Sequence, residues 1–222
     1  MENIQNFLNG KIWSVLDKLE KQSRLEKSHN FDIPPNDRML AISQDTGIFF
    51  NIMLKTMKAK KVLEIGTSVG YSTLWFADAI KQNSQDINEK LIVTIDENPS
   101  KIERAKRNFG DANVDDIIEI KEGRALDILR KMLHDYEENG KVQADQLDFV
   151  FIDADKENLI EYFDTVFLMV REGGIIAADN MLYPEEYRPI MEKYAHYVRS
   201  KPNVQSVTLP IGNGEEFTIK IQ

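Results

Sequence analysis

The chain has 222 residues, of which 42% are apolar and 29% charged, a composition typical of a globular protein rather than a disordered or fibrous one. The absence of cysteine excludes disulfide frameworks, thiolate zinc sites, iron–sulfur clusters and cysteine nucleophiles. With 28 Lys and Arg against 37 Asp and Glu, the net charge of −9 disfavours nucleic-acid and anionic-membrane partners. The amino-terminal residues lack a signal-peptide pattern, and the longest apolar runs are too short to span a membrane. We therefore expect a soluble, cytoplasmic protein.

The amino-terminal part is predicted to be helical. Between residues 2 and 27, apolar residues recur at helical spacing. The prolines of segment 33–36 interrupt this pattern, because proline resists helix interiors, and a second helix is predicted from Gln44 to Met57. These helices form an amino-terminal extension, residues 1–57.

From residue 61 onward, short apolar runs alternate with amphipathic segments. Asn98 and Pro99 provide an N-cap and a first-turn proline for one helix, and Gly212–Gly214 suit a hairpin turn. Strands are predicted at 61–65, 91–95, 117–120, 147–152, 174–178, 204–209 and 217–221, and helices at 71–80, 99–109, 125–136, 158–170 and 185–200.

This alternation predicts the fold class. Strands that alternate with helices pair in parallel through right-handed crossovers, which gives an α/β, doubly wound sheet that is mostly parallel. The predicted sheet has seven strands, and the closing hairpin makes the last strand antiparallel. No linker-like composition interrupts residues 61–222, so we expect one domain over 1–222 with its α/β core at 61–222.

Ligands of open α/β sheets bind beyond the carboxyl ends of the strands, and in this chain those positions are acidic. Glu64 and the loop Gly66–Gly70 come at the end of the first strand, and the loop glycines let the backbone approach a ligand closely. The spacing is G-x-x-x-G rather than the G-x-G-x-x-G of dinucleotide binders, and such glycines also occur where only a tight turn requires them. Asp96 closes the second strand, where it either accepts hydrogen bonds from a ribose or caps the next helix.

Three oxygen ligands, Asp153, Asp179 and Asn180, follow the fourth and fifth strands. Converging carboxylates repel one another unless a cation lies between them, and hard oxygen ligands suit Mg²⁺, with Mn²⁺ or Ca²⁺ as alternatives. The three histidines are scattered without ligand spacing, which disfavours zinc. Lys156 follows Asp153 by three residues, where a nearby cation would favour loss of its proton and suit a general base. Taken singly, each acid could instead cap a helix, and the lysine could be a solvated surface residue.

Five segments carry a family resemblance: VLEIGTSVGYST (62–73), VTIDENP (93–99), KEGRALDIL (121–129), FVFIDADKENLIEYF (149–163) and GGIIAADNML (173–182). Together they resemble the class I S-adenosylmethionine-dependent O-methyltransferases, and within these the cation-dependent caffeoyl-CoA and catechol O-methyltransferases. Residues 42–47 also resemble a family segment, and the resemblance extends from about Ile33 to the C-terminus. It implies a Rossmann-like methyltransferase fold, S-adenosyl-L-methionine as cofactor and a homodimer.

The resemblance also implies roles for individual residues. Asp153, Asp179 and Asn180 match the metal ligands, and Lys156 falls where the catechol methyltransferases carry a lysine base. The cation would lower the pKa of two adjacent phenolic oxygens, Lys156 would take one proton, and the phenolate would attack the sulfonium methyl group. The implied cofactor-binding residues are Glu64, Gly66 and Ser72 at the methionine and sulfonium part, Asp96 at the ribose, Ala125 at the adenine edge, Asp155 at the amino group and Ser43 near the carboxylate, together with Thr67.

One segment departs from the family. Plant-type enzymes have a longer substrate loop after the metal-binding asparagine, whereas here residues 181–186 lead directly into a helix, which argues against coenzyme A thioester substrates. Tyr183 in this segment either stacks on an aromatic acceptor or packs in the interior. The expected acceptor is a small catechol-like molecule, that is, a vicinal diphenol.

Three other functions remain alternatives at this point. A nicotinamide-dependent dehydrogenase would use a similar sheet, but the chain lacks G-x-G-x-x-G and a well-placed Tyr-x-x-x-Lys pair. An RNA or protein methyltransferase is disfavoured by the D-A-D-K sequence and by the net charge. A cofactor-binding module without turnover would have no reason to keep the metal ligands and Lys156 arranged.

Overall fold

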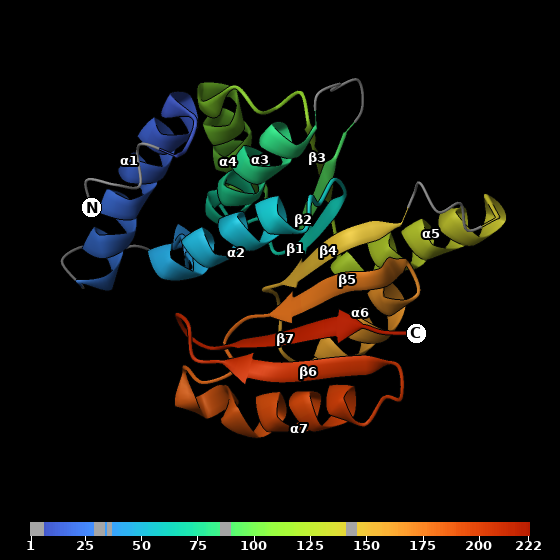
Figure 1. Cartoon of the computed structure of the whole chain (residues 1–222). Coiled ribbons are helices and arrows are strands. Elements are labelled where there is room, and N and C mark those ends of the chain that lie inside the picture. Colours follow the sequence, from blue (N-terminus) through green and yellow to red (C-terminus); the bar gives the residue numbers. More distant parts are fainter. Residues whose placement is uncertain (1–6, 29–33, 35–36, 85–89, 141–145) are drawn as a thin grey trace.

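The computed structural model describes residues 7–28, 34, 37–84, 90–140 and 146–222. Its centre is a seven-stranded sheet with helices on both faces (Figure 1). The strands are β1 (Val62–Ile65), β2 (Ile92–Asp96), β3 (Ile118–Glu122), β4 (Leu147–Ile152), β5 (Val170–Ala178), β6 (Val204–Leu209) and β7 (Glu215–Lys220). The helices are α1 (Gly10–Lys27), α2 (Gln44–Thr56), α3 (Tyr71–Asn83), α4 (Pro99–Ala112), α5 (Ala125–Glu138), α6 (Leu159–Phe167) and α7 (Arg188–Arg199), and a 3-10 turn, η4 (Glu185–Tyr187), precedes α7.

The strand order is β3-β2-β1-β4-β5-β7-β6, and β1 to β5 pair in parallel. β7 is inserted between β5 and β6 and is antiparallel to both. The doubly wound, mostly parallel sheet with an antiparallel last strand is therefore confirmed. Ile65 of β1 pairs with Ile95 and Ile152, so three central strands end at one level and their following loops meet at the same edge. In Figure 1 the arrowheads of β4, β5 and β6 lie at the edge where β7 begins.

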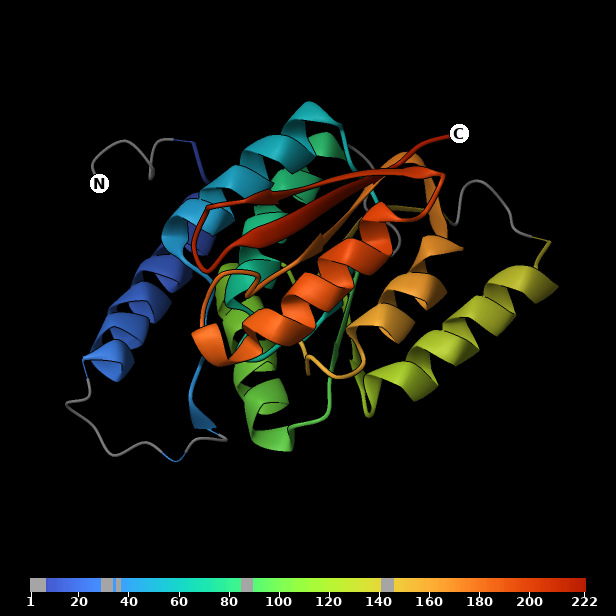
Figure 2. The ribbon, with the colours of Figure 1, turned by 90° about the horizontal axis from the view of Figure 1, so that it is seen from below.

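The helices divide into two layers (Figure 2). Helices α1 to α4 pack on one another on one face, and α5 to α7 do so on the other. On the first face, four completely buried aromatic rings, Phe50, Phe76, Phe149 and Phe151, lie 5.2–6.1 Å apart between ring centroids. Each buried ring of this kind stabilises the fold by about 1.5–3 kcal/mol relative to an exposed one. These layers form two separate cores with the sheet between them.

The first helix begins later than its apolar spacing predicts. It starts at Gly10, because the Asn9 side chain accepts a hydrogen bond from the Lys11 backbone N–H (3.0 Å) and the Asn9 N–H donates to Asp78 Oδ1 (2.8 Å). The prediction of helix from residue 2 is therefore wrong for residues 7–9, and residues 1–6 lie outside the described part. Of the predicted break at 33–36, only residue 34 is described.

Three boundaries near the carboxyl terminus also differ from prediction. The predicted helix 158–170 ends at Phe167, because Val170 pairs with Leu147 and begins β5. The predicted helix 185–200 starts with the 3-10 turn and becomes α-helical only at Arg188. The last strand begins at Glu215 rather than at residue 217, which places two glutamates inside the sheet.

None of the described helices is both long enough and apolar enough to cross a membrane.

Candidate active site

A cavity of about 390 Å³ lies at the carboxyl ends of β1, β2 and β4 and beside the start of α5. Five of the predicted site residues line it: Gly66, Asp96, Ala125, Asp153 and Asp155. Its lining also includes side chains that the sequence did not single out, among them Glu97, Arg124, Asn158 and Tyr162. Its volume falls within the range of small-molecule sites.

The glycines of the β1–α3 loop are required by the protein's own packing. Gly66 has φ +108°, and a Cβ there would lie 2.0 Å from the Asp153 carbonyl oxygen. Gly70 has φ +83°, and a Cβ there would lie 2.3 Å from the Phe109 ring. Both glycines are therefore needed for a tightly packed turn, as the alternative interpretation expected. Gly66 also lines the cavity.

Glu64 lies inside a hydroxyl network next to this loop. It is completely buried, and its carboxylate accepts hydrogen bonds from Ser72, from Thr73 (2.5 Å) and from Thr94 (2.6 Å). Burial raises the pKa of Glu64 to about 7, although the three hydroxyl donors oppose this shift. Thr67 is buried too, with its hydroxyl 2.6 Å from that of Thr94. The lining of the cavity does not include Glu64, Thr67 or Ser72, so their contact with the cofactor stays a prediction.

Asp96 holds two loops together at the rim of the cavity. Its Oδ2 accepts a hydrogen bond from the Ser68 N–H (2.7 Å), and its Oδ1 accepts one from the Asn98 N–H (2.9 Å). The cap of α4 is Asn98, whose side chain accepts from two backbone N–H groups of the first turn. Asp96 is therefore not that cap. Because each carboxylate oxygen can accept more than one hydrogen bond, Asp96 can still bind hydroxyl groups of a ligand.

Asp155 organises the opposite wall. Its Oδ1 accepts hydrogen bonds from the Asn158 backbone N–H (3.1 Å) and side-chain amide (2.7 Å), and its Oδ2 accepts one from the Tyr162 hydroxyl. Burial and the adjacent Asp155 raise the pKa of Tyr162 above its usual range, so this hydroxyl remains a donor. Tyr162 was not among the predicted site residues, although its place seven residues after Asp155 on the next helix was a usable signal.

The predicted base lies against the predicted metal ligands. Lys156 Nζ is 3.4 Å from Asp153 Oδ1, and the Lys156 side chain is only 9% exposed. The alternative of a solvated surface lysine is therefore wrong. Asp179 is 3% exposed, and its Oδ1 accepts a hydrogen bond from the Asn180 N–H (2.6 Å). Burial raises the pKa of Asp179 to about 7, and the negative charge of Asp153 adds to the shift.

A further acidic group, Glu215, joins these residues from β7. It is completely buried, and its pKa is raised well above the usual range by burial and then by Asp179 and Asp153. Among the described residues, neither of its carboxylate oxygens receives a hydrogen bond. Glu215 was not among the predicted site residues, because the predicted strand began two residues later.

The donor set for a cation consists of two carboxylates and one amide. Asp153, Asp179 and Asn180 offer the hard oxygen atoms that Mg²⁺, Mn²⁺ and Ca²⁺ prefer. Within the described ranges, no three His, Cys, Asp or Glu side chains are gathered so as to hold a metal ion. Asp179 and Glu215 are nevertheless buried acids that interact: Asp179 raises the pKa of Glu215, whereas Glu215 lowers that of Asp179.

Two other predicted residues lie away from the cavity lining. Ser43 caps α2 by accepting a hydrogen bond from the Thr46 N–H (3.0 Å), and a Cβ on Gly212 would lie 3.0 Å from its hydroxyl. Tyr183 is 63% exposed and so does not pack in the interior. The parts assigned to them in binding cofactor and acceptor stay predictions.

The family model described as O-methyltransferase matches residues 17–221. The chain belongs to the O-methyltransferase family. Caffeoyl-CoA O-methyltransferase 2 of Populus trichocarpa is 33% identical over 193 residues, which cover 79% of this chain and 73% of the relative. The catechol O-methyltransferase of Niastella koreensis is 33% identical over 143 residues, which cover 64% of this chain and 59% of the relative. The family resemblance of the sequence motifs is thereby confirmed.

Solved structures share the fold. An O-methyltransferase of tomaymycin synthesis from Streptomyces achromogenes, solved in complex with SAM, has a TM-score of 0.73 at 24% identity and covers 96% of this chain and 91% of its own. An O-methyltransferase from Bacillus cereus, solved with SAH, has a TM-score of 0.69 at 24% identity, with 93% and 90% covered. This chain is thus an enzyme of the S-adenosylmethionine-dependent O-methyltransferase class, and the dehydrogenase alternative is left without support.

Proposed function

We propose that this O-methyltransferase transfers the methyl group of S-adenosylmethionine to one hydroxyl of a small vicinal diphenol, with a divalent cation at Asp153, Asp179 and Asn180. The observation that carries the proposal is the position of Asp153. Asp153 lines the cavity, its carboxylate lies 3.4 Å from the Lys156 ammonium, and its charge raises the pKa of the buried Asp179. One residue therefore connects the cavity to the buried acids and the base.

The cavity suits a cationic nucleoside. Its polar lining is mainly acidic, with Asp96, Glu97, Asp153, Asp155 and Glu157, and a sulfonium and an amino group both favour such walls. Asp96 keeps acceptor capacity for ribose hydroxyls, and Ala125 begins α5, where free backbone N–H groups are available to a purine edge. The relatives solved with SAM and with SAH support the same class of ligand.

When bound, S-adenosylmethionine supplies an electrophilic methyl group and the cation lowers the pKa of the acceptor hydroxyls. Lys156, as the neutral amine, would accept the proton of one hydroxyl at Nζ, and Asp153, 3.4 Å away, would hold that amine in place. Water exclusion follows from the burial of Lys156 and Asp179. The relatives named caffeoyl-CoA and catechol O-methyltransferases support an acceptor with a vicinal diphenol ring.

The test is a methyl-transfer assay with catechol and, as matched control, resorcinol, whose two hydroxyls are too far apart to share one cation. We expect methylated product from catechol and none from resorcinol. Caffeoyl-CoA forms a further arm, and a much lower kcat/KM than for a small catechol is expected, because the segment after Asn180 runs directly into η4. Equal turnover of resorcinol and catechol would contradict the proposal.

Two variants assign the residues. Lys156→Met should lower kcat by about 100-fold or more, the usual contribution of a general base. Asp153→Asn should lower kcat together with the response to Mg²⁺. The exposed Glu186→Gln is the control and should leave both unchanged. Unaltered turnover in both active-site variants would refute the assigned roles.

A further inference from the structure

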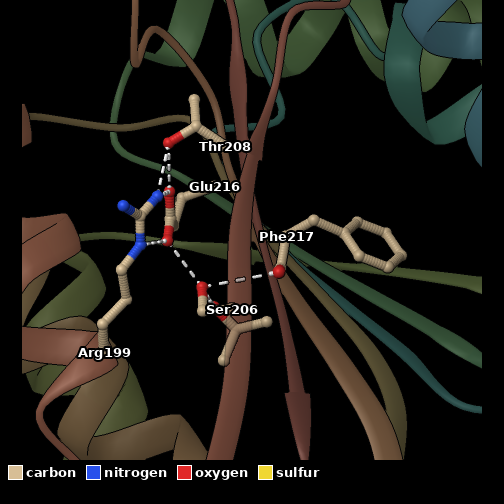
Figure 3. Close-up of polar contacts among 6 residues, drawn as sticks. Arg199, Ser206, Thr208, Glu216 and Phe217 are labelled. Atoms are coloured by element: carbon tan, nitrogen blue, oxygen red, sulfur yellow. Dashed lines mark hydrogen bonds and ion pairs between the residues drawn. The ribbon is translucent and has the colours of Figure 1, made fainter.

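Two carboxylates of this protein differ in the number of hydrogen bonds that they accept. Glu216 of β7 is completely buried and accepts four. Two come from the Arg199 guanidinium (2.8 and 2.7 Å), and one each comes from the hydroxyls of Ser206 and Thr208 (both 2.6 Å) (Figure 3). Each Glu216 oxygen therefore accepts two hydrogen bonds, which is the capacity of a carboxylate. Asp155, in the wall of the cavity, accepts only three from the described residues.

The two oxygen atoms of Asp155 differ in what they can still bind. Oδ1 accepts hydrogen bonds from the Asn158 backbone N–H (3.1 Å) and from the Asn158 side-chain amide (2.7 Å), so both of its acceptor positions are filled. Oδ2 accepts one only from the Tyr162 hydroxyl among the described residues. Because Asp155 is exposed and lines the cavity, the second acceptor position of Oδ2 is open to one donor of a ligand.

The side chain of Asn158 orients the carboxylate instead of capping its own helix. Asn158 occupies the N-cap position of α6, where an asparagine usually accepts hydrogen bonds from backbone N–H groups of the first turn. Here the side chain makes no cap hydrogen bond, and its amide donates to Asp155. Oδ1 also closes the turn before α6 through the Asn158 backbone. With Oδ1 as a pivot, the direction of Oδ2 depends on its hydrogen bond to Tyr162.

Tyr162 is suited to set that direction because its ring is firmly packed. It is 2% exposed and belongs to the core under α5 to α7, whereas Asp155 lies in the loop between β4 and α6. Burial and the contact with Asp155 raise the pKa of Tyr162 above its usual range, so the hydroxyl stays protonated and remains a donor. A buried ring thus sets the position of an exposed loop carboxylate.

We propose that Tyr162 is a positioning residue for the cofactor, which aims the open acceptor position of Asp155 Oδ2 at the charged amino group of S-adenosylmethionine. The inference rests on the cofactor site of the proposed function. Tyr162 acts through Asp155: its hydroxyl holds the carboxylate, and the carboxylate accepts one N–H of the amino group. A charged amino group suits this place better than a hydroxyl, because the lining residues Asp153 and Glu157 are also acidic and favour positive charge.

The experiment is a double-mutant cycle on S-adenosylhomocysteine binding, measured by calorimetry on the whole chain. Asp155→Ala should weaken binding by about 10- to 100-fold, as expected for a lost charged hydrogen bond. Tyr162→Phe removes only the hydroxyl and should weaken binding by about 5- to 10-fold. In the Asp155→Ala background, Tyr162→Phe should change the Kd by less than about twofold, because no carboxylate remains for the hydroxyl to position.

A second probe and a matched control separate positioning from a structural role. The analogue of S-adenosylhomocysteine that lacks the methionine-derived amino group should bind wild type and Tyr162→Phe with Kd values within about twofold of each other. Tyr197→Phe is the control, because Tyr197 also donates to an aspartate, Asp164 (2.6 Å), but outside the cavity lining. It should leave the Kd for S-adenosylhomocysteine unchanged. Tyr162→Met is the second variant in case phenylalanine impairs folding, and the same loss is expected.

The outcomes separate this inference from the proposed function. Wild-type protein that does not bind S-adenosylhomocysteine would overturn both. Additive effects in the cycle, an equal loss with the analogue or an equal loss in Tyr197→Phe would overturn the role of Tyr162 alone. The expected pattern of Kd values without methylation of catechol would support the role of Tyr162 and contradict the acceptor of the proposed function.

Discussion

The buried carboxylate of Glu64 makes stability depend on pH in a way that one substitution removes. Its pKa rises from 4.5 to about 7 on folding, chiefly because burial penalises the charged form. An acid whose pKa is raised in the folded state favours folding at low pH, and this advantage is lost as the pH rises from 4.5 through 7, because the unfolded chain ionises first.

The magnitude follows from the shift. At about 1.4 kcal/mol per pKa unit, the full effect is about 3 kcal/mol, most of which falls between about pH 5 and about pH 8. Glu64→Gln keeps the shape of the side chain without its charge. The free energy of unfolding of the wild-type protein should therefore fall by about 2–3 kcal/mol more than that of the variant over this range.

The assay is urea denaturation at about pH 5 and about pH 8 without added metal, followed by circular dichroism. Glu186→Gln, an exposed acid, serves as the control and should follow the wild-type profile. Parallel profiles for wild type and Glu64→Gln would refute the reasoning, because they would mean that Glu64 ionises alike in the folded and unfolded chains.

Gly66→Ala should destabilise the protein by about 3 kcal/mol or more, because the added Cβ would lie 2.0 Å from the Asp153 carbonyl oxygen. Gly123→Ala, also at a positive φ but with its Cβ 3.6 Å from the nearest atom, should lower the free energy of unfolding by only about 1–2 kcal/mol. Urea denaturation measures both changes. Arg199→Met should cost about 3–5 kcal/mol by leaving Glu216 buried without its cation, and adding Glu216→Gln should restore part of that loss in a double-mutant cycle. Asp96→Asn should weaken S-adenosylhomocysteine binding by about 10- to 100-fold in calorimetry, as expected for a lost charged hydrogen bond. Unchanged affinity would mean that Asp96 does not bind the ribose.

Local sequence patterns predicted most of the helices and strands. Runs such as LDFVFI at 147–152 are bounded by polar residues and form the strand that they predict. Asn98 followed by Pro99 caps α4 as expected. The run around Val166–Val170 is apolar throughout, so periodicity could not distinguish helix from strand, and the boundary between α6 and β5 was misplaced.

The site was predictable where residues directly follow strands. Asp96, Asp153 and Asp155 meet in one cavity because parallel strands end at a common edge. Contacts made across the fold were not predictable from spacing. The hydroxyl of Thr94 reaches Glu64 across 30 positions of sequence, and Glu215 joins Asp179 only because β7 is inserted beside β5.

The most direct test of the central claim is the initial rate of catechol methylation in excess EDTA and after Mg²⁺ or Mn²⁺ is restored. Chelation should abolish turnover while S-adenosylhomocysteine still binds, and added cation should restore the rate, because the buried acids beside Lys156 are proposed to act through the metal. Full methyl transfer in excess EDTA would contradict the account.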